Sequence, residues 1–359
     1  MLKVLDRYIL GRFFRALVVV TFAVIILVVA INMIEKLRDF VDHNVPTRDV
    51  AQYYLYYSGW AVKSFLPIFV FLAGLFAIGV MAKNNEVRAV KASGVSLFRF
   101  SLPLLITALL LGAAHFYYNE YIFPPANRRM VELKEFTIQQ RSKSSVINRR
   151  NLYRQVSDSV YYVIDLYSVP DRTGRGIKLY QRRKNTLGDF IAAREMRFNK
   201  GSWKLYDGSY RNLSDSGETF TTFDSLAVPL ITDRPADLER RLGAPDDMSY
   251  DELQYYIKLM KRTGGPYLAE LVELKTKMSF PFTSLIVMTL CIPLASRRRK
   301  SGIAGALAGA AGIILLYFVS YKVVKSLGAH GAIPPDVAAW GVNVTFFCVG
   351  VVMNIVSSK

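Results

Sequence analysis

The sequence has few of the residues from which enzyme and metal sites are built. It contains only 2 cysteines, Cys291 and Cys348, and 3 histidines among 359 residues. Both cysteines fall in apolar stretches, which excludes a disulfide framework and predicts that they pack as small apolar side chains. The histidines, His43, His115 and His330, lack metal-binding spacing. We therefore predict no metal site and no catalytic triad.

Acidic residues are also scarce, with 28 Asp+Glu against 46 Lys+Arg and a net charge of +18. A nucleic-acid-binding protein could carry this charge, but it would rarely also have 52% hydrophobic residues and a mean hydropathy of +0.22. The charged and apolar residues must therefore be segregated along the chain. We expect no nucleic-acid partner.

Six uncharged apolar runs are each long enough to cross a membrane as a helix, which takes about 18 residues or more. They are residues 16–34, 65–82, 101–118, 278–296, 301–321 and 337–357. The first run is too long for a signal peptide and no cleavage pattern follows it, so residues 1–15 are expected to remain as a tail. Since six such runs cannot be the core of one globular domain, the sequence predicts a polytopic membrane protein.

The charges between the runs predict the orientation. Residues 1–15, 83–100, 297–300 and Lys359 carry 13 basic and 2 acidic residues, whereas the short segments of the opposite side are balanced. By the positive-inside rule both termini are cytoplasmic, and the segment between the third and fourth runs is external. No cluster of ionisable residues appears in the spans beyond Lys63 and His115, both near span ends, which disfavours a membrane-embedded enzyme.

The external segment is expected to form an all-β domain followed by helices. Stretches typical of strands recur between turn residues: 151–156, 160–167, 177–182, 190–198, 203–206, 210–213 and 219–228. Short strands at this spacing indicate a sandwich, jelly roll or open barrel. A capping-box pattern at Ser249 and Glu252 then begins an amphipathic helix. The predicted domains are 1–122, 123–248, 249–277 and 278–359.

The stretch after the second run, KNNEVRAVKASGVS at 83–96, predicts a short helix over residues 85–93. Glu86 lies near its positive end, Lys91 near its negative end, and Gly94 follows as a C-cap. Val87, Ala89 and Val90 supply a small apolar patch that could dock in a groove of another protein. The alternative is an interfacial helix that only reconnects two spans.

Here the sequence resembles a known family. The string EVRAVKASGVS at 86–96 is similar to the coupling-helix signature of the LptF/LptG permeases, the membrane subunits of the lipopolysaccharide-export ABC transporter, and VLDRYI at 4–9 is similar to the start of the LptG branch. Further similar strings are NE at 119–120, PP at 124–125, MSYDEL at 248–253, Lys277 with PF at 281–282, and IPP at 333–335 with Trp340. The order of three spans, β domain and three spans is that of the family.

The resemblance implies a six-helix permease of the bacterial inner membrane with a periplasmic, jelly-roll-like β domain that passes lipid onward. It implies coupling to a cytoplasmic ATPase dimer of the LptB type through Glu86, Val87, Arg88, Val90, Lys91, Ser93 and Gly94, with Glu86 as the polar anchor. A second permease of the LptF type and a single-span periplasmic subunit of the LptC type would complete the complex. The chain itself has no G-x-x-x-x-G-K-[ST] phosphate loop, so it needs no cofactor and ATP is hydrolysed by the partner.

Two groups of residues are candidates for lipid binding. By resemblance, Lys36 and Arg38 after the first run would contact lipopolysaccharide phosphates; the alternative is cations that snorkel to the interface. In the fifth run, Gly305 and Gly309 centre a face of small residues that permits close helix approach. That face would either pack within the chain or border the lipid cavity shared with the second permease.

The sequence thus favours a non-enzymatic permease subunit that extracts lipopolysaccharide, or a similar anionic glycolipid, from the inner membrane. The alternative is a non-transporting envelope scaffold that anchors a periplasmic β domain and needs no ATPase.

Overall fold

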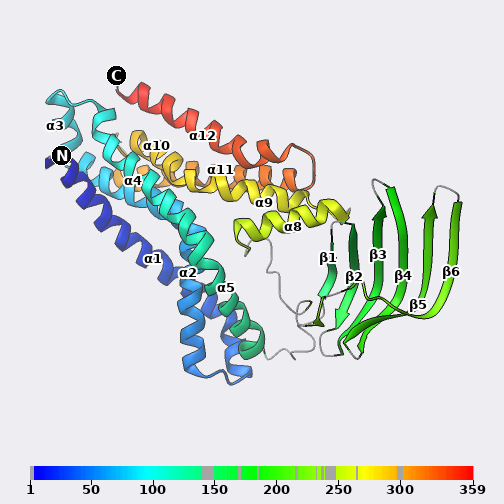
Figure 1. Ribbon diagram of the computed structural model, residues 1–359. Helices are drawn as coiled ribbons and strands as arrows, with labels where there is room; N and C mark the ends of the chain where they lie inside the picture. Colours follow the sequence, from blue (N-terminus) through cyan, green and yellow to red (C-terminus); the bar gives the residue numbers. More distant parts are fainter. Residues whose placement is uncertain are drawn as a thin grey trace. The chain divides into compact units, whose positions relative to one another are not determined.

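The computed structural model is a set of long helices and one β-sheet (Figure 1). It describes residues 4–139, 149–157, 159–168, 171–183, 186–199, 201–214, 217–231, 233–235, 238, 248–263, 266–296 and 302–358. The basic run at 297–300 and Lys359 lie outside the described residues. The chain divides into two compact units. The first comprises Met1–Val131, Pro245–Leu253 and Leu268–Lys359, and the second comprises Glu132–Ala244 and Gln254–Tyr267.

The helices follow the apolar runs of the sequence. They are α1 (Val4–Asp42), α2 (Thr47–Lys83), α3 (Glu86–Ala92), α4 (Leu97–Tyr117), the π-helical η1 (Tyr118–Ile122), α5 (Phe123–Glu132), the π-helical η2 (Leu133–Ile138), α8 (Tyr250–Thr263), α9 (Leu268–Ser279), the 3-10 turn η4 (Phe280–Phe282), α10 (Thr283–Ser296), α11 (Gly302–Ala329) and α12 (Pro335–Ser358). Six helical segments are long and apolar enough to span a membrane. The prediction of a polytopic helical membrane protein is confirmed.

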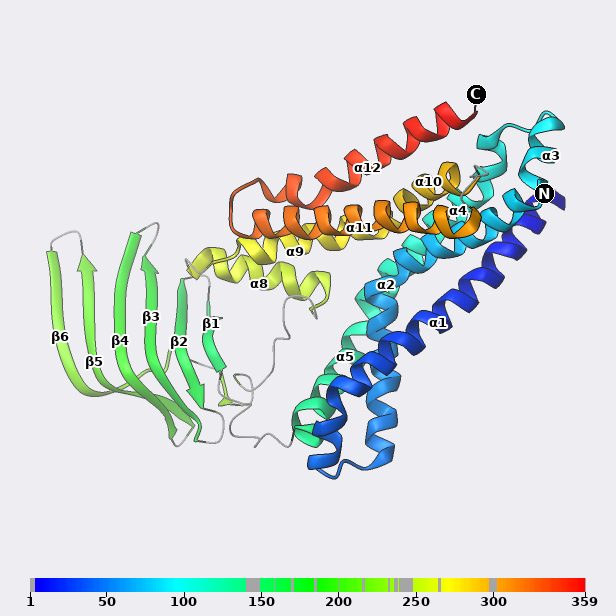
Figure 2. The same cartoon turned by 180° about the vertical axis from the view of Figure 1, so that it is seen from behind.

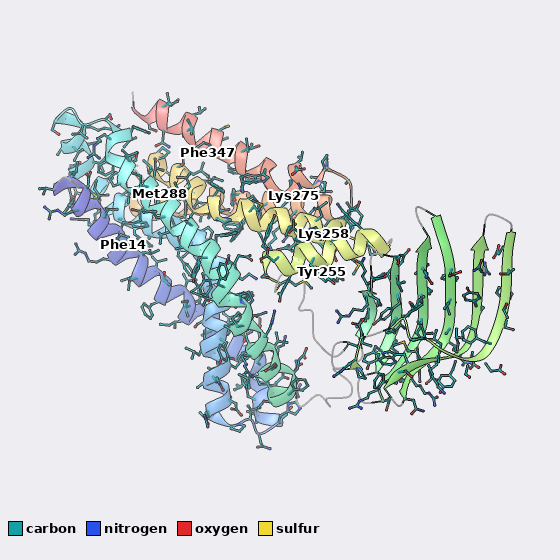
Figure 3. All side chains as sticks on the ribbon, in the orientation of Figure 1. Phe14, Tyr255, Lys258, Lys275, Met288 and Phe347 are labelled. Carbon is teal, nitrogen blue, oxygen red and sulfur yellow. The ribbon has the colours of Figure 1, made fainter. Side chains whose placement is uncertain are left out.

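Two helical segments, α2 and the α9–α10 segment, form the centre of the first unit. The most apolar window of α2 is 61% buried and that of the α9–α10 segment is 72% buried, whereas that of α1 is only 6% buried. Figure 3 shows the contrast, with Met288 of α10 inside the bundle and Phe14 of α1 and Phe347 of α12 at its surface. The outer helices therefore present large apolar surfaces to lipid or to partner helices.

A buried polar cluster joins the helices of the second half. The Tyr317 hydroxyl donates to Asn343 Oδ1 at 2.6 Å and lies 3.0 Å from the Thr283 hydroxyl. The Asn343 amide donates to the carbonyl of Ser279 at 3.1 Å. Because lipid offers no alternative partners, these bonds fix the mutual register of α9, α10, α11 and α12.

The second unit holds a six-stranded antiparallel sheet in the order β1-β2-β3-β4-β5-β6 (Figure 2). The strands are β1 (Arg149–Gln155), β2 (Val160–Ser168), β3 (Thr173–Arg183), β4 (Thr186–Asn199), β5 (Ser202–Ser214) and β6 (Gly217–Ala227). The inserted β domain is confirmed. Its described strands follow a meander, since each pairs with its sequence neighbour, without the Greek-key crossovers of a jelly roll.

Two residues with positive φ lie in one transverse row of the sheet. Gly176 of β3 (φ 67°) and Asp207 of β5 (φ 50°) both adopt the left-handed conformation at this row. Near this row Ile164 and Met196 approach the same position, since a Cβ on Gly174 would lie 3.0 Å from each. Apolar side chains on either side of this row form one continuous core.

The same row accounts for an error in the strand prediction. Asp207 and Gly208 were expected to form a turn between two strands, but β5 runs through them without interruption. A Cβ on Gly208 would lie 2.3 Å from the Phe223 ring and 2.6 Å from the carbonyl oxygen of Ala192. The glycine is needed for close packing of strands, a role that a turn signal alone does not reveal.

The segment after β6 covers part of the core. Val228 and Ile231 are buried in it, and the Trp203 indole donates to the carbonyl of Asp233 at 2.7 Å. The Tyr162 hydroxyl donates to the Asp233 carboxylate at 2.6 Å. Burial, reinforced by this carboxylate, raises the pKa of the Tyr162 phenol well above its usual value, so it remains a neutral donor.

Candidate functional site

The short helix α3 lies at the end of the bundle where α1 begins and α12 ends (Figure 1). Left-handed residues flank it on both sides, Asn85 at φ 61° and Gly94 at φ 83°. Asn and Gly tolerate this conformation best, so the chain can turn sharply into and out of one short helix. The predicted helix over residues 85–93 is present as Glu86–Ala92, with Glu86 in its first turn and Lys91 in its last.

The apolar residues of α3 face the bundle, contrary to the predicted docking patch. Val87 is only 3% exposed and belongs to the same core cluster as Ile9, Phe13 and Leu97, and Val90 packs against that cluster. Of the three expected patch residues only Ala89 is exposed. Val87 thus holds α3 in place and is not available to a partner in this structure, and Val90 is partly buried beside it.

Glu86 is held by contacts within the chain. Its carboxylate accepts a hydrogen bond from the Tyr8 hydroxyl at 2.8 Å and an ion-pair contact from Arg12 at 3.1 Å. The Asn84 amide donates to it at 3.3 Å, and Arg12 also contacts Tyr8. The side chains of Glu86 and Arg12 remain 26% exposed. The carboxylate therefore contacts the start of α1 and also remains partly accessible to solvent.

Two further contacts fix the surroundings of α3. Arg99, at the start of α4, makes two hydrogen bonds of 2.9 Å to the buried carboxylate of Asp6 in α1. Lys91 donates to the carbonyl of Ser357, near the end of α12, at 2.8 Å. Bidentate arginine–carboxylate pairs are strong and directional. The starts of α1 and α4 are thereby tied together beside the helix.

The outward surface of α3 is small, cationic and hydrogen-bonding. Arg88, Lys91, Ser93 and Gly94 are exposed, and the Ser93 hydroxyl donates to the carbonyl of Val90 at 2.8 Å. A rigid helix seated by valines and carrying such residues can dock a protein but offers no nucleophile with an activating base. Among the described residues no group of His, Cys, Asp or Glu could hold a metal ion.

The four candidate lipid residues lie at two different places in the chain. Lys36 and Arg38 are in the last turns of α1, where Arg38 is exposed and 3.9 Å from Asp42. Gly305 and Gly309 are in the first turns of α11, so they lie toward the opposite end of the bundle. The structure therefore does not bring the two pairs into one site within this chain.

The small-residue face of α11 points partly outward. Ala310 is buried in the bundle core, whereas a Cβ on Gly312 would meet nothing within 4 Å. Ala310 therefore packs within the chain, as in the first of the two alternatives for the small-residue face. The open position at Gly312 leaves the other side of α11 accessible to a further helix or to lipid.

Sequence reasoning missed most of the ionic contacts around α3. Asp6, Arg12 and Arg99 were counted only as contributions to the charge balance. One signal was present, because Asp6 is the single acidic residue of the basic segment 1–15. A lone acid in such a segment is a candidate for a specific ion pair, but its partner, 93 positions away, depends on the tertiary fold.

Comparisons with known proteins agree with this architecture. The chain is 29% identical over 172 residues to an uncharacterized protein of Aquifex aeolicus, a match that spans 47% of that protein and 46% of this chain. It is 20% identical over 297 residues to the lipopolysaccharide export system permease protein LptG of Escherichia coli K12, covering 80% of both chains. The sequence model of the family "Lipopolysaccharide export system permease LptF/LptG" matches residues 7–355. The chain belongs to the LptF/LptG family of lipopolysaccharide export permeases.

Proposed function

We propose that this chain is the permease subunit of an ABC transporter that extracts lipopolysaccharide, or a similar anionic glycolipid, and passes it to a periplasmic bridge. A separate cytoplasmic ATPase dimer of the LptB type supplies the energy, and a second permease of the LptF type completes the lipid cavity. A single-span subunit of the LptC type receives the lipid. ATP-driven closure of the ATPase moves the two permeases against each other as rigid bodies.

The observation that carries this proposal is the seating of α3. Val87 fixes the helix to the bundle core, while Arg88, Lys91 and Ser93 are exposed. A push on a helix fixed in this way is transmitted to the packed spans and not absorbed by a flexible loop. The basic residues at 83–100 support a cytoplasmic location for this end of the bundle by the positive-inside rule, where an ATPase can reach it.

The lipid path is supported by an exposed apolar surface on α1 and by the apolar interior of the β domain. The middle of α1 exposes a series of large apolar side chains: Val18, Val19, Phe22, Ile26, Leu27 and Ile31. The β domain contains a continuous core of buried apolar side chains, among them Met196 and Trp203. An amphipathic glycolipid needs apolar surface for its acyl chains and cations for its phosphates, which Lys36 and Arg38 can supply at the end of α1.

Photocrosslinking tests the lipid assignment. With a photoreactive amino acid at Lys36, Arg38, Gly305 or Gly309, we expect labelled lipopolysaccharide to crosslink in proteoliposomes that contain the full complex. Val344 of α12, which is also exposed, provides the matched position outside the proposed cavity. Labelling at the four positions no stronger than at Val344 would remove them from the lipid path.

A further inference from the structure

A buried carboxylate lies where the third span leaves the bundle, at the end away from α3. Glu120 is in the π-helical turn η1, between α4 and α5, and its side chain is only 6% exposed. A π-helical turn inserts an extra residue and redirects the side chains around it, and such turns are frequent at functional positions. A buried charge at this position needs specific partners.

Its partners come from two distant parts of the chain. Lys277 of α9 donates to Glu120 Oε1 at 2.8 Å and is itself only 10% exposed. The backbone N–H of Tyr250, the first residue of α8, donates to Glu120 Oε2 at 2.5 Å. One carboxylate thus joins the exit of the third span, the entrance of the fourth and the N-terminus of α8, where a negative charge is favourable.

A second set of contacts holds the same turn of α8. Ser249 and Glu252 form the predicted capping box, with bonds of 3.1 Å and 3.3 Å between each side chain and the other residue's backbone N–H. Glu252 also accepts two hydrogen bonds from Arg128 of α5, at 3.0 and 3.1 Å. The first turn of α8 is therefore anchored twice to the helix that leaves the third span.

This anchored turn is the start of a helix that continues into the second unit. Residues up to Leu253 belong to the first unit, and Gln254–Tyr267 belong to the second, which also holds the sheet. An ion pair buried this deeply contributes little net stability compared with apolar residues of the same size. The ion pair instead specifies the orientation of α8, because only one orientation of the helix keeps both buried charges paired.

We propose that Glu120 and Lys277 are positioning residues that lock the first turn of α8 to the third and fourth spans. The lock makes α8 follow the spans, so that their movement is transmitted toward the β domain. This inference rests on the proposed function, since it concerns how the permease delivers lipid to that domain. It assigns a role to the strings at 119–120, 248–253 and 277, which the coupling helix and the lipid cavity leave unexplained.

The test compares Lys277→Met with the matched control Lys275→Met, since both lysines lie on α9. Lys275 also forms an ion pair at the end of α9, with Asp336 at 2.5 Å, but it is 31% exposed and its partner 71%. Figure 3 labels Lys275 on α9 and both Tyr255 and Lys258 on α8. Lys277→Arg keeps the charge and serves as the rescue variant. Glu120→Gln keeps an acceptor for the Tyr250 N–H while removing the charge.

Spin labels report the position of α8 directly. Cysteines replace the exposed Leu55 of α2 and Asp251 of α8, both in the first unit, in a Cys348→Ser background, while the native Cys291 is fully buried and resists labelling. In the full complex we expect a narrow distance distribution for the unchanged protein, Lys275→Met and Lys277→Arg. We expect a broader distribution for Lys277→Met and Glu120→Gln, because the first turn of α8 then keeps only its contacts with Arg128 and its capping box.

Lipid delivery and ATPase stimulation are measured on the same samples. We expect Lys277→Met and Glu120→Gln to lower ATP-dependent crosslinking of lipopolysaccharide to the β domain about tenfold, within the range of coupling between linked sites. Stimulation of the ATPase should stay close to that of Lys275→Met. Distance distributions and lipid delivery equal to those of Lys275→Met would overturn the inference, as would a parallel loss of ATPase stimulation and delivery. Failure of the unchanged complex to stimulate the ATPase would instead contradict the proposed function. The distance distributions would still show whether Glu120 and Lys277 hold α8 in position.

Discussion

Replacing Glu86 with lysine is expected to reduce co-purification of the partner ATPase by about thirty-fold, equivalent to ~2 kcal/mol, the lower end for breaking a desolvated interfacial charge pair. The reason is that Glu86 is the one acidic residue of α3, and its carboxylate remains partly exposed for a cation of the partner. The measurement is affinity purification of the complex followed by quantification of the ATPase. An intact complex with intact ATPase stimulation would remove the coupling assignment.

The control for this prediction separates docking from folding. Glu86→Lys also breaks the contacts with Tyr8 and Arg12 inside the chain. Arg12→Met removes the same ion pair but leaves the carboxylate available. We expect Arg12→Met to bind the ATPase as well as the unchanged protein does. If it loses binding to the same extent as Glu86→Lys, then the intrachain cluster, and not an anchor to the partner, explains the effect.

Gly112→Ala is expected to destabilise the helical unit by about 1–3 kcal/mol, as overpacking of a close-packed interior does. Gly112 lies in α4, where a Cβ would stand 2.2 Å from the backbone carbonyl oxygen of Pro281 and 3.2 Å from its carbonyl carbon. Backbone cannot rotate away as a side chain can, so α4 and the η4 turn must separate. Thermal unfolding in detergent or nanodiscs should show a lower midpoint.

Gly79→Ala provides the matched substitution. Gly79 also lies inside a long helix, α2, but nothing is within 4 Å of the position of its Cβ. Alanine has the higher helix propensity, so this variant should be neutral or slightly more stable. Equal midpoints for Gly112→Ala and Gly79→Ala would contradict the close approach of α4 and η4.

The sequence predicts the spans and α3 well because each has a local signal. Long apolar runs determine which segments cross the membrane, and the residues around Glu86 and Gly94 mark a short helix. Local signals do not show which face of that helix is buried. Val87 was expected to contact a partner, yet the turns at Asn85 and Gly94 direct it into the bundle core.

Contacts between distant segments could not be predicted from the sequence, for a physical reason. The pairs Glu86–Arg12 and Lys277–Glu120 join residues 74 and 157 positions apart, so they exist only once the helices have packed. The meander of the sheet is a similar case. Strand-like stretches were recognised, but the left-handed Asp207 inside β5 has the same residue signal as a hairpin turn.

The most direct test of the transport proposal is ATP-dependent delivery of lipid to the β domain. This chain is co-expressed with a candidate ATPase and a second permease, and the complex is reconstituted with labelled lipopolysaccharide. A photoreactive amino acid replaces Phe220, an exposed apolar residue of β6 in the β domain. We expect the ATPase to co-purify and the crosslink to form only with hydrolysable ATP. Absence of any complex with the ATPase, or equal crosslinking without ATP, would contradict the proposal and favour a non-transporting scaffold.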